Sequence, residues 1–291
     1  MATTASIDIL KLLHLNATYS SIAYEDDTVA RQLFSELGVE HSMFFSGVST
    51  QAYVGKGPGG KTVISFRGTE GTCVADIVTD VRFKKVSYKV GKVHEGFKLA
   101  LDEVYSYLVA HLEGITTKDS KIVINGHSLG GALALLCATR LKLEEGYKDV
   151  TLYTFGQPKA GDKEFIEKVE ELFKDEYFRV VNDEDVVPKL PTYWKMKFDH
   201  NDTVYFIDDD PKITKQAEGY AIISNLVEYV ADAFEAHTSN EGDAFKALAK
   251  ENAKEAVEDH SILQYISQLS IAIEKLEMIG KVKINENESH A

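Results

Sequence analysis

The order of apolar and polar positions predicts strands and helices that alternate through the middle of the chain. Short runs rich in β-branched and aromatic residues are typical of strands, and longer stretches with apolar residues every three or four positions are typical of helices. The expected strands are 51–55, 61–66, 85–93, 122–125, 150–155, 178–181 and 204–207. The expected helices are 28–37, 95–112, one that begins at Ser128, and 162–173. This alternation predicts the α/β class, with a mostly parallel central sheet and helices on both faces.

Both ends of the chain show helical patterns. Near the N-terminus, apolar residues recur at helical spacing: Ile7, Leu10, Leu13 and Ala17. After Ile213 three helical stretches are expected: 216–236, 243–258 and 261–278. We therefore expect one domain over 1–280, with an extra helical cap or insertion at 213–258 and a polar C-terminal tail at 281–291.

Composition and charge narrow the classes of partner. The apolar fraction of 44% and charged fraction of 27% are ordinary for a globular protein of 291 residues. A net charge of −14 argues against nucleic acid and anionic membrane surfaces, but it does not exclude neutral lipid or small esters. The sequence has no charge-free stretch long enough to span a membrane and no usual signal peptide, so a cytoplasmic location is expected.

A Gly-x-Ser-x-Gly sequence lies between an apolar strand and an Ala/Leu-rich helix, at residues 126–130. A sharp strand-to-helix turn brings backbone close to the serine, so only a hydrogen is tolerated at Gly126 and Gly130. The turn exposes the Ser128 hydroxyl and aims the first helix amides at the atom that the serine attacks. This context indicates the nucleophile elbow of an α/β-hydrolase, with Ser128 as nucleophile.

A serine nucleophile needs a carboxylate and a histidine, which follow it in that order on this fold. The expected strand 178–181 leads into an acidic loop, and spacing alone leaves Asp183, Glu184 and Asp185 as candidates, with a solvated acidic turn as the alternative.

The histidines downstream of Ser128 are His200, His237, His260 and His290. His260 is favoured because it starts a helix with apolar residues behind it, and a rigid element holds a catalytic group well.

The oxyanion of a tetrahedral intermediate also needs hydrogen-bond donors. The amide of Leu129, the residue after the serine, is one candidate. Thr69 is another, because the strand 61–66 ends just before it, Gly68 lets the backbone turn, and both its amide and its hydroxyl can donate. An ordinary strand-ending turn is the alternative.

Six segments resemble those of the class 3 lipases, and they occur in the same order. They are FRGT (66–69), VHEGF (93–97), GHSLGGALA (126–134), YTFGQPKAGD (153–162), VVNDEDVVPKLP (180–191) and DHSILQY (259–265). The resemblance covers about 45–275 and implies an α/β-hydrolase fold with a short lid helix. It also implies Ser128 as nucleophile, Asp185 as acid, His260 as base, and Thr69 with Leu129 as oxyanion hole.

Two features depart from the family's common form. The stretch between Asp185 and His260 is longer, and Asp202 stands where the family often has glycine. Neither departure involves the three residues that the resemblance assigns to the triad.

The family's lid position corresponds to residues 70–82. Four apolar residues there recur at i, i+3, i+4 and i+7, on one face of a short helix: Val74, Ile77, Val78 and Val81. A mobile lid that opens at a lipid surface is the favoured interpretation, and a fixed surface helix is the alternative.

No cofactor and no metal are expected. The acidic run Asp208–Asp210 lacks the interleaved ligands and glycine of a calcium loop, so a solvated turn is the better interpretation.

We therefore expect a serine carboxylic ester hydrolase that cleaves acylglycerols or related lipid esters through an acyl-enzyme, with substrate met at a lipid–water interface. The alternatives are a lid-independent esterase or phospholipase A1 for short-chain, aromatic or phospholipid esters, and a catalytically silent interaction module with a hydrolase fold.

Overall fold

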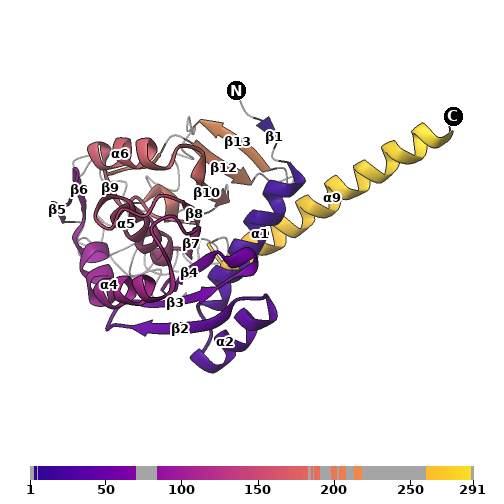
Figure 1. Ribbon diagram of the computed structural model, residues 1–291. Helices are drawn as coiled ribbons and strands as arrows, with labels where there is room; N and C mark the ends of the chain where they lie inside the picture. Colours follow the sequence, from indigo (N-terminus) through magenta and orange to yellow (C-terminus); the bar gives the residue numbers. More distant parts are fainter. Residues whose placement is uncertain are drawn as a thin grey trace, which may run out of the picture.

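A nine-stranded sheet forms the centre of the fold (Figure 1), in the order β1-β13-β12-β10-β8-β7-β4-β3-β2. The computed structural model describes residues 3–4, 6–69, 84–182, 185, 187–190, 198–201, 203–207, 213–217 and 260–289. The strands are β1 (Thr3–Thr4), β2 (Glu40–Ser46), β3 (Gln51–Lys56), β4 (Thr62–Phe66), β7 (Ile122–His127), β8 (Val150–Phe155), β10 (Tyr177–Asn182), β12 (Thr203–Ile207) and β13 (Ile213–Ala217). The five strands from β12 to β4 are parallel, and antiparallel strands flank them on both sides.

The register of the parallel strands brings their carboxyl ends to one edge. Phe66 at the end of β4 pairs with Gly126 of β7, and His127 pairs with Phe155 at the end of β8. Ligands of open α/β sheets bind outside the carboxyl ends of the strands, so this edge is where a site is expected.

Helices cover both faces of the central sheet (Figure 1). They are α1 (Ile7–Ile22), α2 (Asp27–Glu36), α4 (Glu95–Ile115), α5 (Leu129–Leu143), α6 (Lys163–Phe173) and α9 (Ile262–Ser289). Ile122 and Ile124 of β7 pack with α4, α5 and α6, whereas Val123 between them packs with α1 and α9. Successive side chains of a strand point to opposite faces of the sheet, so β7 contributes to the apolar cores on both of its faces.

A second, four-stranded antiparallel sheet lies beside the first in the order β11-β9-β6-β5. Its strands are β5 (Lys85–Ser87), β6 (Lys92–His94), β9 (Gly161–Asp162) and β11 (Phe198–Asp199). Short 3₁₀ helices occur at Pro58–Gly60, Lys174–Glu176 and Val187–Lys189.

The predicted α/β-hydrolase fold class is confirmed, and four local predictions need correction. The expected single strand at 85–93 is two strands, β5 and β6, which form a hairpin because the chain turns between Ser87 and Lys92. The strand β2 was not expected. Helical character does not begin at Ile213, because Ile213–Ala217 pairs with β12 as a strand. The tail predicted at 281–291 continues α9 to Ser289, and Figure 1 shows this end of α9 extending away from the sheet. The lid prediction at 70–82 and the rest of the cap prediction lie outside the described residues.

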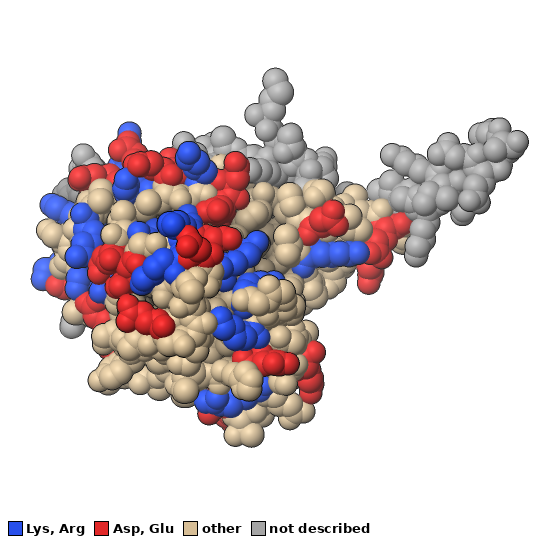
Figure 2. Space-filling view, in the orientation of Figure 1, with Lys and Arg blue, Asp and Glu red and all other residues tan. Residues whose placement is uncertain are grey.

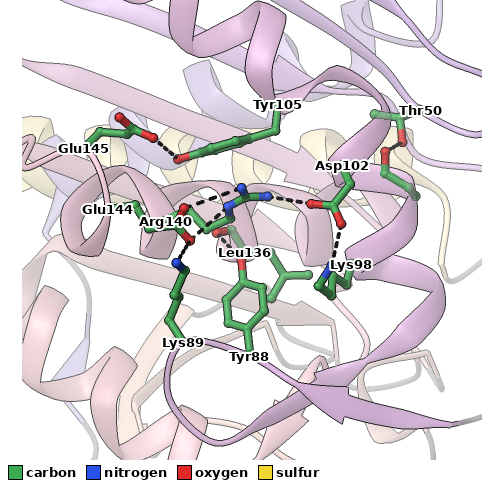
Figure 3. Close-up of polar contacts among 11 residues, drawn as sticks. Thr50, Tyr88, Lys89, Lys98, Asp102, Tyr105, Leu136, Arg140, Glu144 and Glu145 are labelled. Carbon is green, nitrogen blue, oxygen red and sulfur yellow. Dashed lines mark hydrogen bonds and ion pairs between the residues drawn. The ribbon is translucent and has the colours of Figure 1, made fainter.

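Arg140 of α5 makes contacts that link α5 to α4 (Figure 3). Its guanidinium lies 3.6 Å from the ring centroid of Tyr105, Nη1 donates to Asp102 at 2.6 Å, and Nε lies 3.2 Å from a Glu144 oxygen. Because the Arg140 side chain is only 17% exposed, this cluster of charges is screened less than an ordinary surface pair.

Charges of both signs are interspersed over the described part of the face shown in Figure 2. Among the described helices, none is long and apolar enough to cross a membrane.

Candidate active site

Ser128 lies on a strained turn between β7 and α5. Its φ of 57° and ψ of −128° are rarely adopted by a residue with a side chain. A Cβ at Gly126 would collide with the Gly130 backbone, and one at Gly130 would collide with the Phe66 carbonyl oxygen. The turn is therefore as tight as the Gly-x-Ser-x-Gly spacing predicts, and the backbone amide of Ser128 anchors it by donating to the Phe155 oxygen at 2.9 Å.

Asp185 and His260 are hydrogen bonded to each other although 75 positions separate them in the chain. Nδ1 of His260 lies 2.9 Å and 2.8 Å from the two carboxylate oxygens of Asp185. Asp185 follows β10, and its Oδ1 also accepts from the Val187 amide at 2.9 Å. A carboxylate at Nδ1 stabilises the imidazole tautomer whose Nε2 is free to accept a proton.

The Asp185–His260 pair lies beside Ser128 at the same edge of the sheet. A Cβ at Gly156, the residue after β8, would meet Asp185 Oδ2 at 2.7 Å and the His260 ring at 2.8 Å. The preceding residue, Phe155, is the one whose carbonyl holds the Ser128 amide. His127, next to Ser128, packs its ring 4.5 Å from the His260 ring.

The two groups that a proton transfer would join are without a hydrogen-bond partner in the described part of the chain. Ser128 Oγ and His260 Nε2 are both buried without a hydrogen-bond partner among the described residues. Ser128, Asp185 and His260 are 0%, 0% and 1% exposed, so water does not solvate them in this state. Buried polar atoms without partners are rare, and active sites are among the places where they occur.

Of the other candidates for acid and base, only His200 lies within the described residues. His200 is buried, lies 2.7 Å through Nε2 from the Pro188 carbonyl, and is held neutral because burial and the charges of Arg179 and Lys159 lower its pKa well below 6.5. Asp183, Glu184, His237 and His290 lie outside the described residues.

The two predicted oxyanion donors also lie at this edge. Leu129 is the first residue of α5, where backbone amides lack helical acceptors. The Oγ1 atom of Thr69 is buried without a hydrogen-bond partner in the described part of the chain. The loop that carries Thr69 packs on the start of α5, because a Cβ at Gly130 would meet both Phe66 and Arg67.

Three further side chains bind this cluster and were not predicted as site residues. The Tyr265 hydroxyl donates to Asp185 at 2.5 Å, the Tyr24 hydroxyl bonds His127 at 2.8 Å, and His127 in turn lies 2.6 Å from the His260 carbonyl oxygen. Tyr265 and His127 lie inside the family-like segments quoted above, so a signal for them was present. Tyr24 lies just after α1, far from every such segment, and the sequence holds no signal for it.

No group of three or more His, Cys, Asp or Glu side chains within the described residues could hold a metal ion.

The chain is similar in sequence to known lipases. The profile of the family described as Lipase (class 3) matches residues 63–194. The lipase of Rhizomucor miehei is 40% identical over 176 residues, which are 57% of this chain and 47% of that protein. The chain thus spans about half the length of that relative.

Solved structures of lipases resemble the fold of this chain over a larger part of its length. The triacylglyceride lipase of Rhizomucor miehei superposes with a TM-score of 0.64 at 29% identity, over 78% of this chain and 92% of that one. A triacylglycerol lipase whose catalytic centre is formed by a serine protease triad superposes with a TM-score of 0.64 at 27% identity, over the same 78% and 92%. Motif order, fold and these similarities agree, and the chain resembles the class 3 lipases in both sequence and structure.

Proposed function

We propose that this protein is a serine ester hydrolase that cleaves acylglycerols or closely related lipid esters. The observation that carries the proposal is the buried hydrogen bond between His260 Nδ1 and Asp185, beside a serine held on a strained turn. Relatives and solved neighbours that are lipases, among them triacylglycerol lipases, support the substrate class.

In the proposed reaction, Ser128 Oγ attacks the carbonyl carbon of the ester while His260 Nε2 takes its proton. The bond from that carbon to the alcohol oxygen then breaks, and the proton passes from His260 to the leaving alcohol. Water repeats the sequence on the acyl-enzyme, and the carboxylic acid leaves. Asp185 holds the ring and stabilises the imidazolium that forms in each half-reaction.

The oxyanion formed in each step needs donors that are already in place. We assign this role to the Leu129 amide and to Thr69. Thr69 Oγ1 is buried without a partner among the described residues, and this supports the assignment, because an unsatisfied donor is available for a developing negative charge.

The substrate is proposed to be met at a lipid–water interface. Support comes from the complete burial of Ser128, since an ester reaches the serine only after neighbouring parts of the protein move. Contact with lipid can favour such an opened state if the opened state binds lipid better than the closed one.

The test is hydrolysis of p-nitrophenyl esters from acetate to palmitate by wild type and Ser128→Ala, with and without emulsified triglyceride. We expect cleavage of long-chain esters, a rise in rate at the emulsion, and loss of activity in the variant. If the protein cleaves only short-chain esters, its function is that of an esterase and not of a lipase. An inert wild type that also fails to label with a fluorophosphonate would overturn the proposal.

A further inference from the structure

The Tyr24 hydroxyl connects two segments that flank the proposed catalytic centre. Tyr24 lies just after α1, and its hydroxyl is 2.8 Å from Nδ1 of His127. Gly68, in the loop that leads to Thr69, packs against the same hydroxyl, because a Cβ at Gly68 would collide with the Tyr24 oxygen. A phenol hydroxyl both donates and accepts, so the state of the His127 ring decides the direction of its bond with Tyr24.

The second ring nitrogen of His127 fixes which tautomer is present. Nε2 lies 2.6 Å from the carbonyl oxygen of His260, and a carbonyl only accepts hydrogen bonds. Nε2 therefore carries the hydrogen and donates. Burial, with the neighbouring His260, holds the pKa of His127 well below 6.5, so the ring is neutral and its Nδ1 accepts the Tyr24 hydrogen.

We propose that Tyr24 and His127 are positioning residues that hold the main chain of the catalytic base through the chain of hydrogen bonds Tyr24 Oη–H to His127 Nδ1 and His127 Nε2–H to the His260 carbonyl. The inference rests on the proposed function and assigns to it two residues that act through His260.

The geometry explains why two attachments of His260 are needed. Asp185 holds the ring at Nδ1, which fixes the outer end of the side chain. The His127 bond holds the backbone from which the ring projects, on the side of Ser128. With both ends held, Nε2 keeps one direction, as a base must when it takes a proton from a serine.

The first test compares Tyr24→Phe with Tyr19→Phe. Tyr19 is a matched control because it lies on α1, is fully buried, and its hydroxyl has no partner among the described residues. We expect Tyr24→Phe to lower kcat by about tenfold to a hundredfold with KM within about twofold, and Tyr19→Phe to leave both unchanged.

Rates in this test are expressed per active site titrated with a fluorophosphonate, and Tm is measured for each variant. A role in fold stability alone would lower Tm and the number of titrated sites but not kcat per site. Unchanged kcat per site in Tyr24→Phe would overturn the inference. An inert wild type would instead overturn the proposed function, so the two failures are distinguishable.

The second test asks whether Tyr24 acts through His127. His127→Phe keeps a ring in the same packing position and removes both hydrogen bonds. We expect the double variant with Tyr24→Phe to have the same kcat per site as His127→Phe alone, because the chain is already broken. Additive losses would show that Tyr24 acts by another route and would contradict the proposal. If His127→Phe does not fold, the Tyr24→Phe comparison still decides.

Discussion

The Tyr265 hydroxyl donates a hydrogen bond of 2.5 Å to Oδ2 of Asp185, from the first turns of the helix that His260 precedes. Its oxygen accepts from the Asn182 amide at 3.2 Å, so Tyr265 ties α9 to the end of β10. The start of α9 therefore positions both His260 and Tyr265, and Tyr265 donates to the Asp185 carboxylate that orients His260.

Replacing Tyr265 with phenylalanine should impair Asp185 while the ring packing remains. A hydrogen bond to a charged group contributes about 1.5–3 kcal/mol, so we expect Tyr265→Phe to lower kcat by about tenfold and to reduce the free energy of unfolding by about 1–2 kcal/mol. Ester hydrolysis and denaturant unfolding measure the two effects. Tyr153→Phe, in the same apolar core, serves as the control, and equal kcat in both variants would count against a role for Tyr265.

Gly156 provides a test of how closely the site is packed. It has a φ of +56°, and an added Cβ would meet both Asp185 and His260. We expect Gly156→Ala to lower kcat by about a hundredfold or more, because the pair must shift.

Gly146→Ala is the matched control for Gly156→Ala. Gly146 has a similar φ of +73°, but nothing lies within 4 Å of its added Cβ. Backbone strain destabilises both variants by about 1 kcal/mol. Because this cost is shared, only Gly156→Ala should lose activity. Comparable kcat values for the two would refute the packing described here.

The buried neutral histidines predict a loss of stability in mild acid. The pKa of His200 is held well below 6.5 in the folded protein, so below pH 6.5 the unfolded chain binds a proton that the folded one does not. Stability from this group is complete above pH 6.5 and declines as the pH falls, by up to about 1.4 kcal/mol per pH unit.

Urea unfolding of His200→Asn between pH 7.5 and 5 checks this prediction. The variant should show a shallower decline below pH 6.5 than wild type, with His127 still contributing. His41→Asn, at an exposed position, should follow the wild-type curve. Parallel curves for wild type and His200→Asn would mean that folding does not lower the pKa of His200.

Arg140 should contribute to stability through its ring contact as well as its charge. Arg140→Met removes the contact with Tyr105 and the bonds to Asp102 and Glu144, and we expect it to lower the free energy of unfolding by about 1–3 kcal/mol. Arg140→Lys should recover only part of this, since an ammonium lacks the planar stack. Lys148→Met, which breaks an exposed pair with Asp119, should leave Tm unchanged, and an equal shift would contradict the distinction.

Much of the fold and site could be predicted from local patterns. The helices before β2 and the strands β4, β7, β8 and β10 follow from apolar periodicity, because a regular element that packs on the core repeats its apolar positions. β2 could not be predicted, since six of its seven residues are not buried and its pattern is weak. The strand at Ile213–Ala217 was missed because its place is set by pairing with β12, which no local pattern records.

By itself, the sequence determined the turn at Ser128, because glycines at 126 and 130 are required locally by close backbone contacts. It also determined the order of the motifs, and with it the resemblance to the class 3 lipases. Only the tertiary structure decided which side chains support the proposed base. Tyr24 and Tyr265 reach the cluster because α1 and α9 pack on the same face of the sheet. Such contacts depend on how distant elements are placed in space, and spacing along the chain carries no record of that.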